Sequence, residues 1–311
     1  MQDYKLMLDA YKKSGGAPEA FKDSKIAHLV VHKNKVLGKH LVEGLIIVPE
    51  ETESGINVIL TVRKGFRIST PVHLCFGIIP EEGRQEINIQ AKVEDNVRIS
   101  LLAHCVFPNA VKIQHIMKAN IEIGDNAFYE YNEVHFHGEK GGIEVIPQAK
   151  IKVGKKSQLK TNFSLLKGRV GVFDLDYQAE VDDEAVLEMI TKIYGYGEDR
   201  IKIKEGGRLT GKASRGLIKS RIAVRDEAQS EVVNEMIAEG ENSRGHVDCV
   251  EIVQDQALAK AIPIVEVIHP LAQVTHEAAI GRVDKKQVET VMARGLEEEK
   301  AIDIVVGGML K

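Results

Sequence analysis

The side chains of this chain that could hold a metal ion or accept sulfur are three cysteines and a set of histidines. Cys75, Cys105 and Cys249 lie far apart in the 311-residue sequence. An odd and sparse set of thiols argues against a disulfide framework and favours a reducing compartment, so we expect a cytoplasmic protein. Free thiols in that setting are either packed core residues or ligands for metal and sulfur.

One thiol and one imidazole have a spacing that could bring them together. Cys105 lies 30 residues before His135, and His104 and His137 are close by. A chain that winds with 30-residue turns would stack Cys105 on His135, where the pair could bind iron or relay sulfur through the interior. The alternative, which we favour from the residues alone, is a packed core, because Cys105 continues a row of alternating apolar residues. Cys75 lies in a hydrophobic run and is predicted to be core.

These side chains need a scaffold, and the sequence contains a repeat that predicts one. A five-residue pattern recurs: an apolar residue, three polar or turn residues, and a small residue. It follows segments in which apolar residues alternate with other residues. Such segments are typical of strands with one buried face, and the turn residues form corners. Rungs of about 20–30 residues can bury their hydrophobic faces only by stacking. The copies of the repeat are Val93–Val97, Ile123–Ala127, Val153–Ser157, Val181–Ala185, Ile203–Gly207, Val224–Ala228 and Val253–Ala257.

The repeat predicts a mainly β protein, a right-handed parallel β-helix, and a β-sandwich is the alternative. Its ends differ: residues 1–22 have helical spacing, and Asp284 with Gln287 resembles a capping box before two short helices. Those helices either cap the last rung, which their position favours, or dock a partner. The predicted divisions are an N-terminal region of helix and strands (1–85), a β-helix core (86–268) and a C-terminal helical subdomain (269–311).

Composition and motifs exclude several classes of protein. The net charge of −4 gives no bias toward nucleic acid, and no apolar run is long enough to span a membrane. The segment Gly206–Ala213 is one residue short of a P-loop and has no Ser or Thr after its lysine, so this chain should not hydrolyse ATP. β-Helices often belong to carbohydrate-active enzymes, which are mostly secreted, so we keep that class only as a remote alternative.

The C-terminal third resembles the SufB/SufD family of iron–sulfur cluster assembly proteins, in particular a compact archaeal-type SufB. The family carries an RGL segment, an SR-x-x-x-x-C strand, a PxxEV strand, a His-Glu-Ala motif and two closing helices, and all of them occur here in order. The resemblance is close over residues 205–310 and weaker before them. It rests on the segments RGLIK (Arg215–Lys219), ENSRGHVDC (Glu241–Cys249), DQALAKAIPIVEV (Asp255–Val267) and THEAAIGRVDKKQVETVMARGLEEEKAIDIVVGGML (Thr275–Leu310).

The resemblance implies a scaffold protein, not an enzyme, that binds a transient iron–sulfur cluster and passes it to apo iron–sulfur proteins. The matching ligand positions are Cys249, His276 and Glu277, with His276 and Glu277 expected just before a helix. Cys105, His135 and His104, which the spacing and not the resemblance suggests, are a second tier of candidate metal ligands. The implied partners are a SufC-like ABC ATPase at the C-terminal helices and a second copy, or a SufB–SufD-type heterodimer partner, at the end of the β-helix.

One residue departs from the family pattern. SufB proteins usually carry a cysteine in the turn before the PxxEV strand, and this turn holds Ala257. The family's ligand set therefore cannot be copied whole. The alternative function is a structural, SufD-like subunit whose partner holds the cluster.

Overall fold

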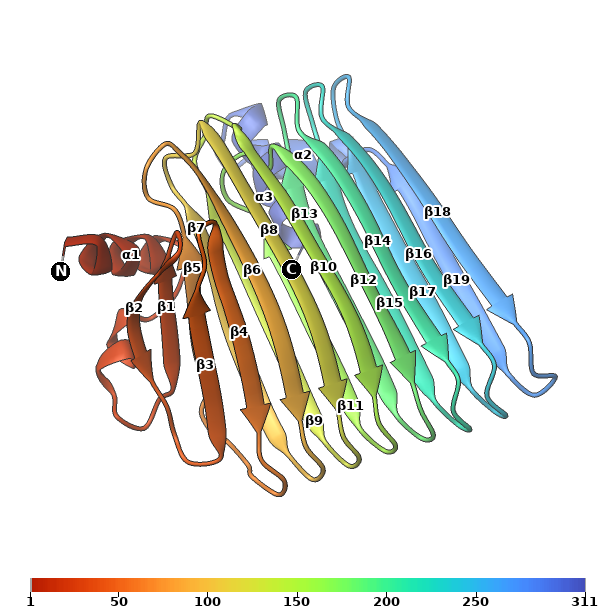
Figure 1. Ribbon diagram of the computed structural model, residues 1–311. Coiled ribbons are helices and arrows are strands. Elements are labelled where there is room, and N and C mark those ends of the chain that lie inside the picture. Colours follow the sequence, from red (N-terminus) through yellow and green to blue (C-terminus); the bar gives the residue numbers. More distant parts are fainter. Residues whose placement is uncertain (1, 311) are drawn as a thin grey trace.

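The computed structural model describes residues 2–310 and is a solenoid of two long, nearly parallel sheets (Figure 1). Each rung contributes one strand to sheet A and one to sheet B, so neighbouring strands within a sheet come from successive rungs. Sheet A contains, in spatial order, β19 (Gln273–Gly281), β17 (Arg244–Val253), β15 (Arg215–Val224), β13 (Val186–Gly195), β11 (Gln158–Leu165), β9 (Phe128–His137), β7 (Arg98–Phe107), β5 (Val72–Gly77), β1 (His28–His32) and β2 (Lys35–His40).

Sheet B has nine strands and runs alongside sheet A (Figure 1). All its pairs are parallel except that between β3 and β4, and the predicted parallel β-helix is thereby confirmed. Its spatial order is β18 (Leu258–Val267), β16 (Gln229–Ala238), β14 (Arg200–Leu209), β12 (Val172–Val181), β10 (Ile143–Val153), β8 (Lys112–Ile123), β6 (Glu82–Val93), β4 (Gly55–Val62) and β3 (Leu45–Glu51).

The corners are fixed by residues with a left-handed backbone. At the corners that lead from sheet B into sheet A, the positive φ falls on the third or fourth residue after the strand, which Asn and Asp tolerate better than most side chains. Successive strands of sheet A from β7 onward begin at residues 98, 128, 158, 186, 215, 244 and 273, so each rung has 28–30 residues. The residues with positive φ at these corners are Asn96, Asn126, Lys156, Glu184, Ala213 and Asn242.

Two features of the predicted repeat were wrong. The copy at Ile203–Gly207 lies inside β14, and the corner is at 210–214. Gly206 and Gly207 lie in a strand and not in a turn, and at Gly207 an added Cβ would lie 2.7 Å from Cδ2 of the buried Leu187. The last two copies of the repeat, at Val224 and Val253, are corners from sheet A into sheet B, which explains the short predicted spacings.

The N-terminal strands continue the same two sheets. β4 pairs with β6 and β5 pairs with β7, so neither sheet changes at residue 85. The helix α1 (Gln2–Lys13) and the 3-10 helix η1 (Pro18–Lys22) confirm the predicted helical start and cover the outer face of sheet A. Met7 and Tyr11 pack there against Cys75 and Val106.

The C-terminal helices lie against the side of the solenoid, behind sheet A in Figure 1. Val306 and Leu310 pack with Ala223 of β15 and Ile252 of β17. The helices α2 (Lys285–Met292) and α3 (Glu298–Met309) agree with the predicted positions, and Asp284 caps α2 by accepting a hydrogen bond from the Lys286 backbone N–H. They do not cover the last rung, so the predicted cap was wrong.

The last rung consists of β18, which ends at Val267, and β19, which continues sheet A past residue 268. Residues 1 and 311, at the outer ends of the predicted divisions, lie outside the described residues, and the division of the chain into three parts stays a prediction. No helix among residues 2–310 is long and apolar enough to cross a membrane.

Candidate functional site

The parallel ladders stack side chains of equal register into columns along the solenoid. In sheet A, one inward-facing column contains Glu133, Phe163, Thr191, Ser220 and Cys249, in successive strands. The next inward-facing column contains Cys105, His135 and, several rungs later, Glu251. Both thiols therefore point into the interior between the two sheets, where burial disfavours the charged thiolate.

Cys249 is positioned by β17, one strand before the open end of the solenoid. It is 2% exposed, and burial raises the pKa of its thiol to about 12, with a further increase from Glu251. Its register neighbours are Ser220 on one side and Ala278 on the other. On the side of the open end, β19 is therefore the only strand of sheet A, within the described residues, that lies beyond the thiol.

His276 and Glu277 lie on β19 and not immediately before a helix as the sequence suggested. The register pairs His276 with Val247, which points inward, and Glu277 with Asp248, whose side chain points outward and pairs with Arg221. Cys249 and His276 therefore share the inner face, and Glu277 lies on the opposite face. Two of the three residues that the resemblance implied thus lie on the same face of neighbouring strands.

The second-tier residues Cys105, His135 and His104 are also divided between the inner and outer faces of sheet A. Cys105 and His135 are register partners on β7 and β9, which confirms the predicted stacking. His104 points outward from β7 and lies beneath α1, where its Nδ1 is 2.5 Å from Ser14 Oγ and its ring centroid is 4.3 Å from that of Tyr11. The prediction that His104 joins Cys105 was wrong, because adjacent strand residues face opposite sides of the sheet.

Sequence reasoning missed two members of the Cys105 cluster, His115 on β8 and Glu133 on β9. One ligand atom each from Cys105, His115 and His135 lie within 4.8 Å of one another, and all three residues are buried. Glu133 Oε1 is 3.7 Å from Cys105 Sγ and 2.8 Å from His135 Nε2. His115 comes from sheet B, so only the closure of the rung brings it near, although its alternation with Ile113 and Met117 marks it as inward-facing.

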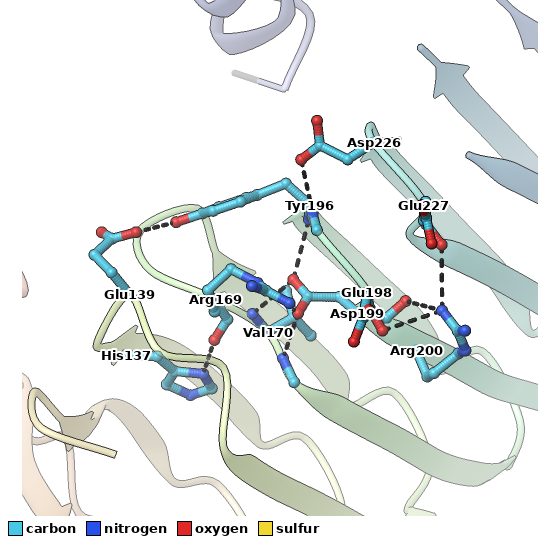
Figure 2. A network of polar contacts seen from close by, with 12 residues as sticks. His137, Glu139, Arg169, Val170, Tyr196, Glu198, Asp199, Arg200, Asp226 and Glu227 are labelled. Atoms are coloured by element: carbon cyan, nitrogen blue, oxygen red, sulfur yellow. Dashed lines mark hydrogen bonds and ion pairs between the residues drawn. The ribbon is translucent and has the colours of Figure 1, made fainter. Parts of the chain in front are cut away.

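The hydrogen bonds determine where protons sit in this cluster. The Arg169 carbonyl can only accept, so His137 donates through Nδ1 at 2.9 Å, and Figure 2 shows its ring directed at that oxygen. The other nitrogen of a neutral His137 then accepts from His135 Nδ1 at 3.2 Å. The remaining lone pair of His135 faces Glu133, so one proton must lie between them. Burial raises the pKa of Glu133 to about 7, which agrees with a carboxyl group that holds this proton.

The corner beside His137 is held by a buried carboxylate (Figure 2). Asp199, 1% exposed, accepts hydrogen bonds from Arg169 Nε at 2.9 Å and from the backbone N–H groups of Val170, Gly171 and Tyr196 at 3.0 Å each. A carboxylate with four donors is fully satisfied in spite of its burial. Arg169 and its carbonyl are thereby fixed, and with them the orientation of His137.

A second buried polar cluster lies between Cys105 and Cys249. Glu205 on β14 accepts hydrogen bonds from Thr191 at 2.7 Å and from Ser220 and Asn234 at 3.4 Å. Burial raises the pKa of Glu205 to about 7. Polar side chains thus occur at intervals along an otherwise apolar interior, toward the end that exposes β19.

Fold and site together define a class of protein, a parallel β-solenoid that carries buried thiol and imidazole groups in its interior and at its open end. The protein-family model described as the SUF system FeS cluster assembly SufBD core domain matches residues 81–309. The chain belongs to the SufBD family of iron–sulfur cluster assembly proteins. Family membership favours cluster assembly over the carbohydrate-active alternative.

Similar proteins agree with this assignment over nearly the whole chain. An iron-sulfur cluster assembly SufBD family protein of Methanocaldococcus jannaschii is 37% identical over 304 residues, which cover 98% of this chain and 96% of the relative. One from Pyrococcus horikoshii is 32% identical over 310 residues, covering 100% and 94%. The SufB protein of Bacillus subtilis is 28% identical over 72 residues, only 23% of this chain and 16% of its own length.

Proposed function

We propose that this chain is the scaffold on which a transient iron–sulfur cluster forms before it passes to apo iron–sulfur proteins in the cytoplasm. The observation that carries the proposal is that Cys249 and His276 share the inner face at the open end of the solenoid. A thiolate and a neutral imidazole are suitable ligands for iron, and the thiolate also accepts sulfur. The chain supplies ligands and makes no bond-breaking step of its own.

The proposed working unit is a homodimer that meets at the last rung. β18 and β19 are edge strands, and they leave large apolar side chains exposed, which a soluble protein ordinarily covers. Glu277 faces away from Cys249, so it can complete the ligand set only if the site straddles two copies. The exposed apolar residues at this end are Leu258, Ile264, Val265, Val267, Ile268, Leu271 and Ile280.

The proposed energy source is a SufC-like ABC ATPase docked on α2 and α3. These helices leave Met292, Ile304 and Met309 exposed, while Asp303 ties α3 to the strands through Tyr194 at 2.8 Å and Arg225 at 3.3 Å. A partner that pulls on α3 would therefore strain β13 and the corner after β15. We propose that this strain opens the last rung and exposes Cys249 to iron and sulfide.

The second candidate function is a structural, SufD-like subunit that supports the complex without holding the cluster. The observation that favours it is Ala257, which occupies the turn where SufB proteins usually carry a cysteine and which is packed at 6% exposure. In that case the cluster ligand would lie on the partner subunit.

Anaerobic reconstitution with ferrous iron and sulfide separates these two functions. The wild-type chain should develop the visible charge-transfer absorption of a cluster, and Cys249→Ser should lose it. Cys75→Ser is the matched control, because Cys75 is an equally buried thiol far from the last rung and should leave the absorption unchanged. A wild type that holds no cluster would support the structural function instead.

A further inference from the structure

The cluster of Cys105, His115, Glu133 and His135 costs free energy as it stands. Buried polar groups nearly always have hydrogen-bond partners, and one without a partner calls for an explanation such as a missing ion. Among the described residues, neither ring nitrogen of His115 has a partner, although the side chain is 1% exposed. Burial also keeps the imidazoles of His115 and His135 neutral by lowering each pKa to about 3, and neutral imidazole is the form that binds metal.

We propose that this interior cluster is a metal site, which holds one divalent first-row transition ion through Cys105, His115, Glu133 and His135. It lies between β7, β8 and β9, many rungs from Cys249, and would be a resident structural site separate from cluster assembly. A set of one thiolate, two imidazoles and one carboxylate suits zinc or ferrous iron in four-coordinate geometry.

The distances fit such an ion after small shifts, in which the atoms of Cys105, His115 and His135 move closer together and His135 Nε2 moves away from Glu133 Oε1. Bond lengths of about 2.0–2.3 Å place tetrahedral ligand atoms about 3.3–3.7 Å apart. The atoms of Cys105, His115 and His135 now lie within 4.8 Å of one another, and Glu133 Oε1 already lies 3.7 Å from the sulfur. His135 Nε2 and Glu133 Oε1 share a proton at 2.8 Å, which the ion would displace.

Charge also balances at this site. The Cys105 thiolate and the Glu133 carboxylate carry two negative charges, which a divalent cation neutralises within an apolar interior. Binding releases two protons to solvent, one from the thiol and one from the His135–Glu133 pair. The ion then takes the place of both protons, and no redox step is involved.

An outer shell is already present to orient the ligands. His135 donates through Nδ1 to His137. Figure 2 shows that His137 is in turn fixed by the Arg169 carbonyl and the Asp199 corner. The Tyr177 hydroxyl donates to Glu133 Oε2 at 3.2 Å and directs Oε1 toward the cluster. Metal-bound histidines and carboxylates are ordinarily held by such partners.

The test is expression of the full chain in medium supplemented with cobalt, followed by measurement of bound metal and visible absorption. Cobalt enters as the chain folds, so the enclosed site can be filled. The wild type should carry one cobalt per chain, with a thiolate-to-cobalt charge-transfer band and tetrahedral d–d bands. Cys105→Ala and His115→Phe should each lose the ion.

Two matched controls exist for these variants. Cys75→Ala removes another fully buried thiol, and His104→Phe removes another buried histidine on the far face of β7, so both should retain the ion. Cys249→Ser should retain it as well, which distinguishes this site from the proposed assembly site. Loss of the cobalt in Cys249→Ser would overturn the proposal, since the metal would then belong to the open end.

Further results would also decide whether the interior cluster binds a metal ion. No cobalt in the wild type, or full occupancy in both Cys105→Ala and His115→Phe, contradicts the site. A sulfur relay at Cys105 would instead give a persulfide on that thiol with no cobalt bound. If the two variants fail to fold, X-ray absorption on the wild type still decides: one sulfur and three nitrogen or oxygen ligands are expected, and an all-oxygen shell overturns the proposal.

Discussion

Single buried carboxyl groups make the stability of this solenoid depend on pH. Glu205 is 1% exposed and contacts only neutral donors, and burial raises its pKa to about 7 from 4.5. Because its folded pKa is raised, the folded state holds a proton that the unfolded state has lost between these values. The contribution of Glu205 to stability is therefore full below about pH 4.5, falls as the pH rises toward 7, and levels off above it.

Glu205→Gln should remove the loss of stability that the ionisation of Glu205 causes as the pH rises. Glutamine keeps the shape and cannot ionise, so the variant should be more stable than wild type at pH 8, by up to about 3 kcal/mol from a shift of this size. Near pH 4 the two proteins should have similar stability. Urea unfolding across pH 4–8 measures the slope, and an unchanged slope in Glu205→Gln would contradict this account.

At the residue scale, the sequence predicted contacts within one sheet better than contacts between sheets. The 30-residue spacing of Cys105 and His135 is a register within sheet A and was readable from the repeat. His115 joins them from sheet B, and its depth in the rung depends on corner lengths that the sequence does not reveal. The family motif predicted Glu277 as a ligand together with His276. The alternation of side chains along a strand, however, places Glu277 on the opposite face of β19 from His276.

Among the elements, α3 carries two distinct surfaces. Val306 is 1% exposed and packs on Ala223 and Ile252, whereas Ile304 on the same helix is 53% exposed. Val306→Asp would bury an unpaired charge and should release α3, which raises amide hydrogen exchange throughout the helix. Ile304→Asp should leave the exchange unchanged.

The two variants Val306→Asp and Ile304→Asp also test whether the ATPase docks on α3. Both variants should weaken binding of a SufC-like ATPase, Val306→Asp by releasing the helix and Ile304→Asp by charging its exposed face. Binding is measured by titration with the purified ATPase. If Ile304→Asp bound the ATPase with full affinity while α3 stayed ordered, the docking surface would have to lie elsewhere on the chain.

At the element scale, local chemistry predicted helices more accurately than strand boundaries. The Asp284 cap and the two closing helices follow from short-range rules that hold in any fold. The false corner at Ile203–Gly207 arose because glycine is typical of turns and here provides room between rungs. His276 and Glu277 precede α2 in sequence, but both residues still belong to β19, which ends at Gly281.

For the whole molecule, the open last rung predicts self-association. Ile268→Asp combined with Leu271→Asp places charges on the exposed apolar end and should convert a dimer into a monomer, because like charges would face each other across the interface. Light scattering after size exclusion measures the mass.

The matched control is Val48→Asp combined with Ile59→Asp. These residues are comparably exposed at the opposite end of the solenoid and should leave the dimer intact. A wild type of monomer mass, or a control that dissociates equally, would refute the interface at the last rung.

The central claim is that this chain itself holds the nascent cluster at Cys249. The most direct measurement is transfer of a reconstituted cluster to an apo-ferredoxin, followed by the circular dichroism of the acceptor under anaerobic conditions. We predict that the wild type and Cys75→Ser convert the acceptor and that Cys249→Ser does not. Equal transfer by Cys249→Ser and wild type would contradict the claim and place the cluster on other ligands.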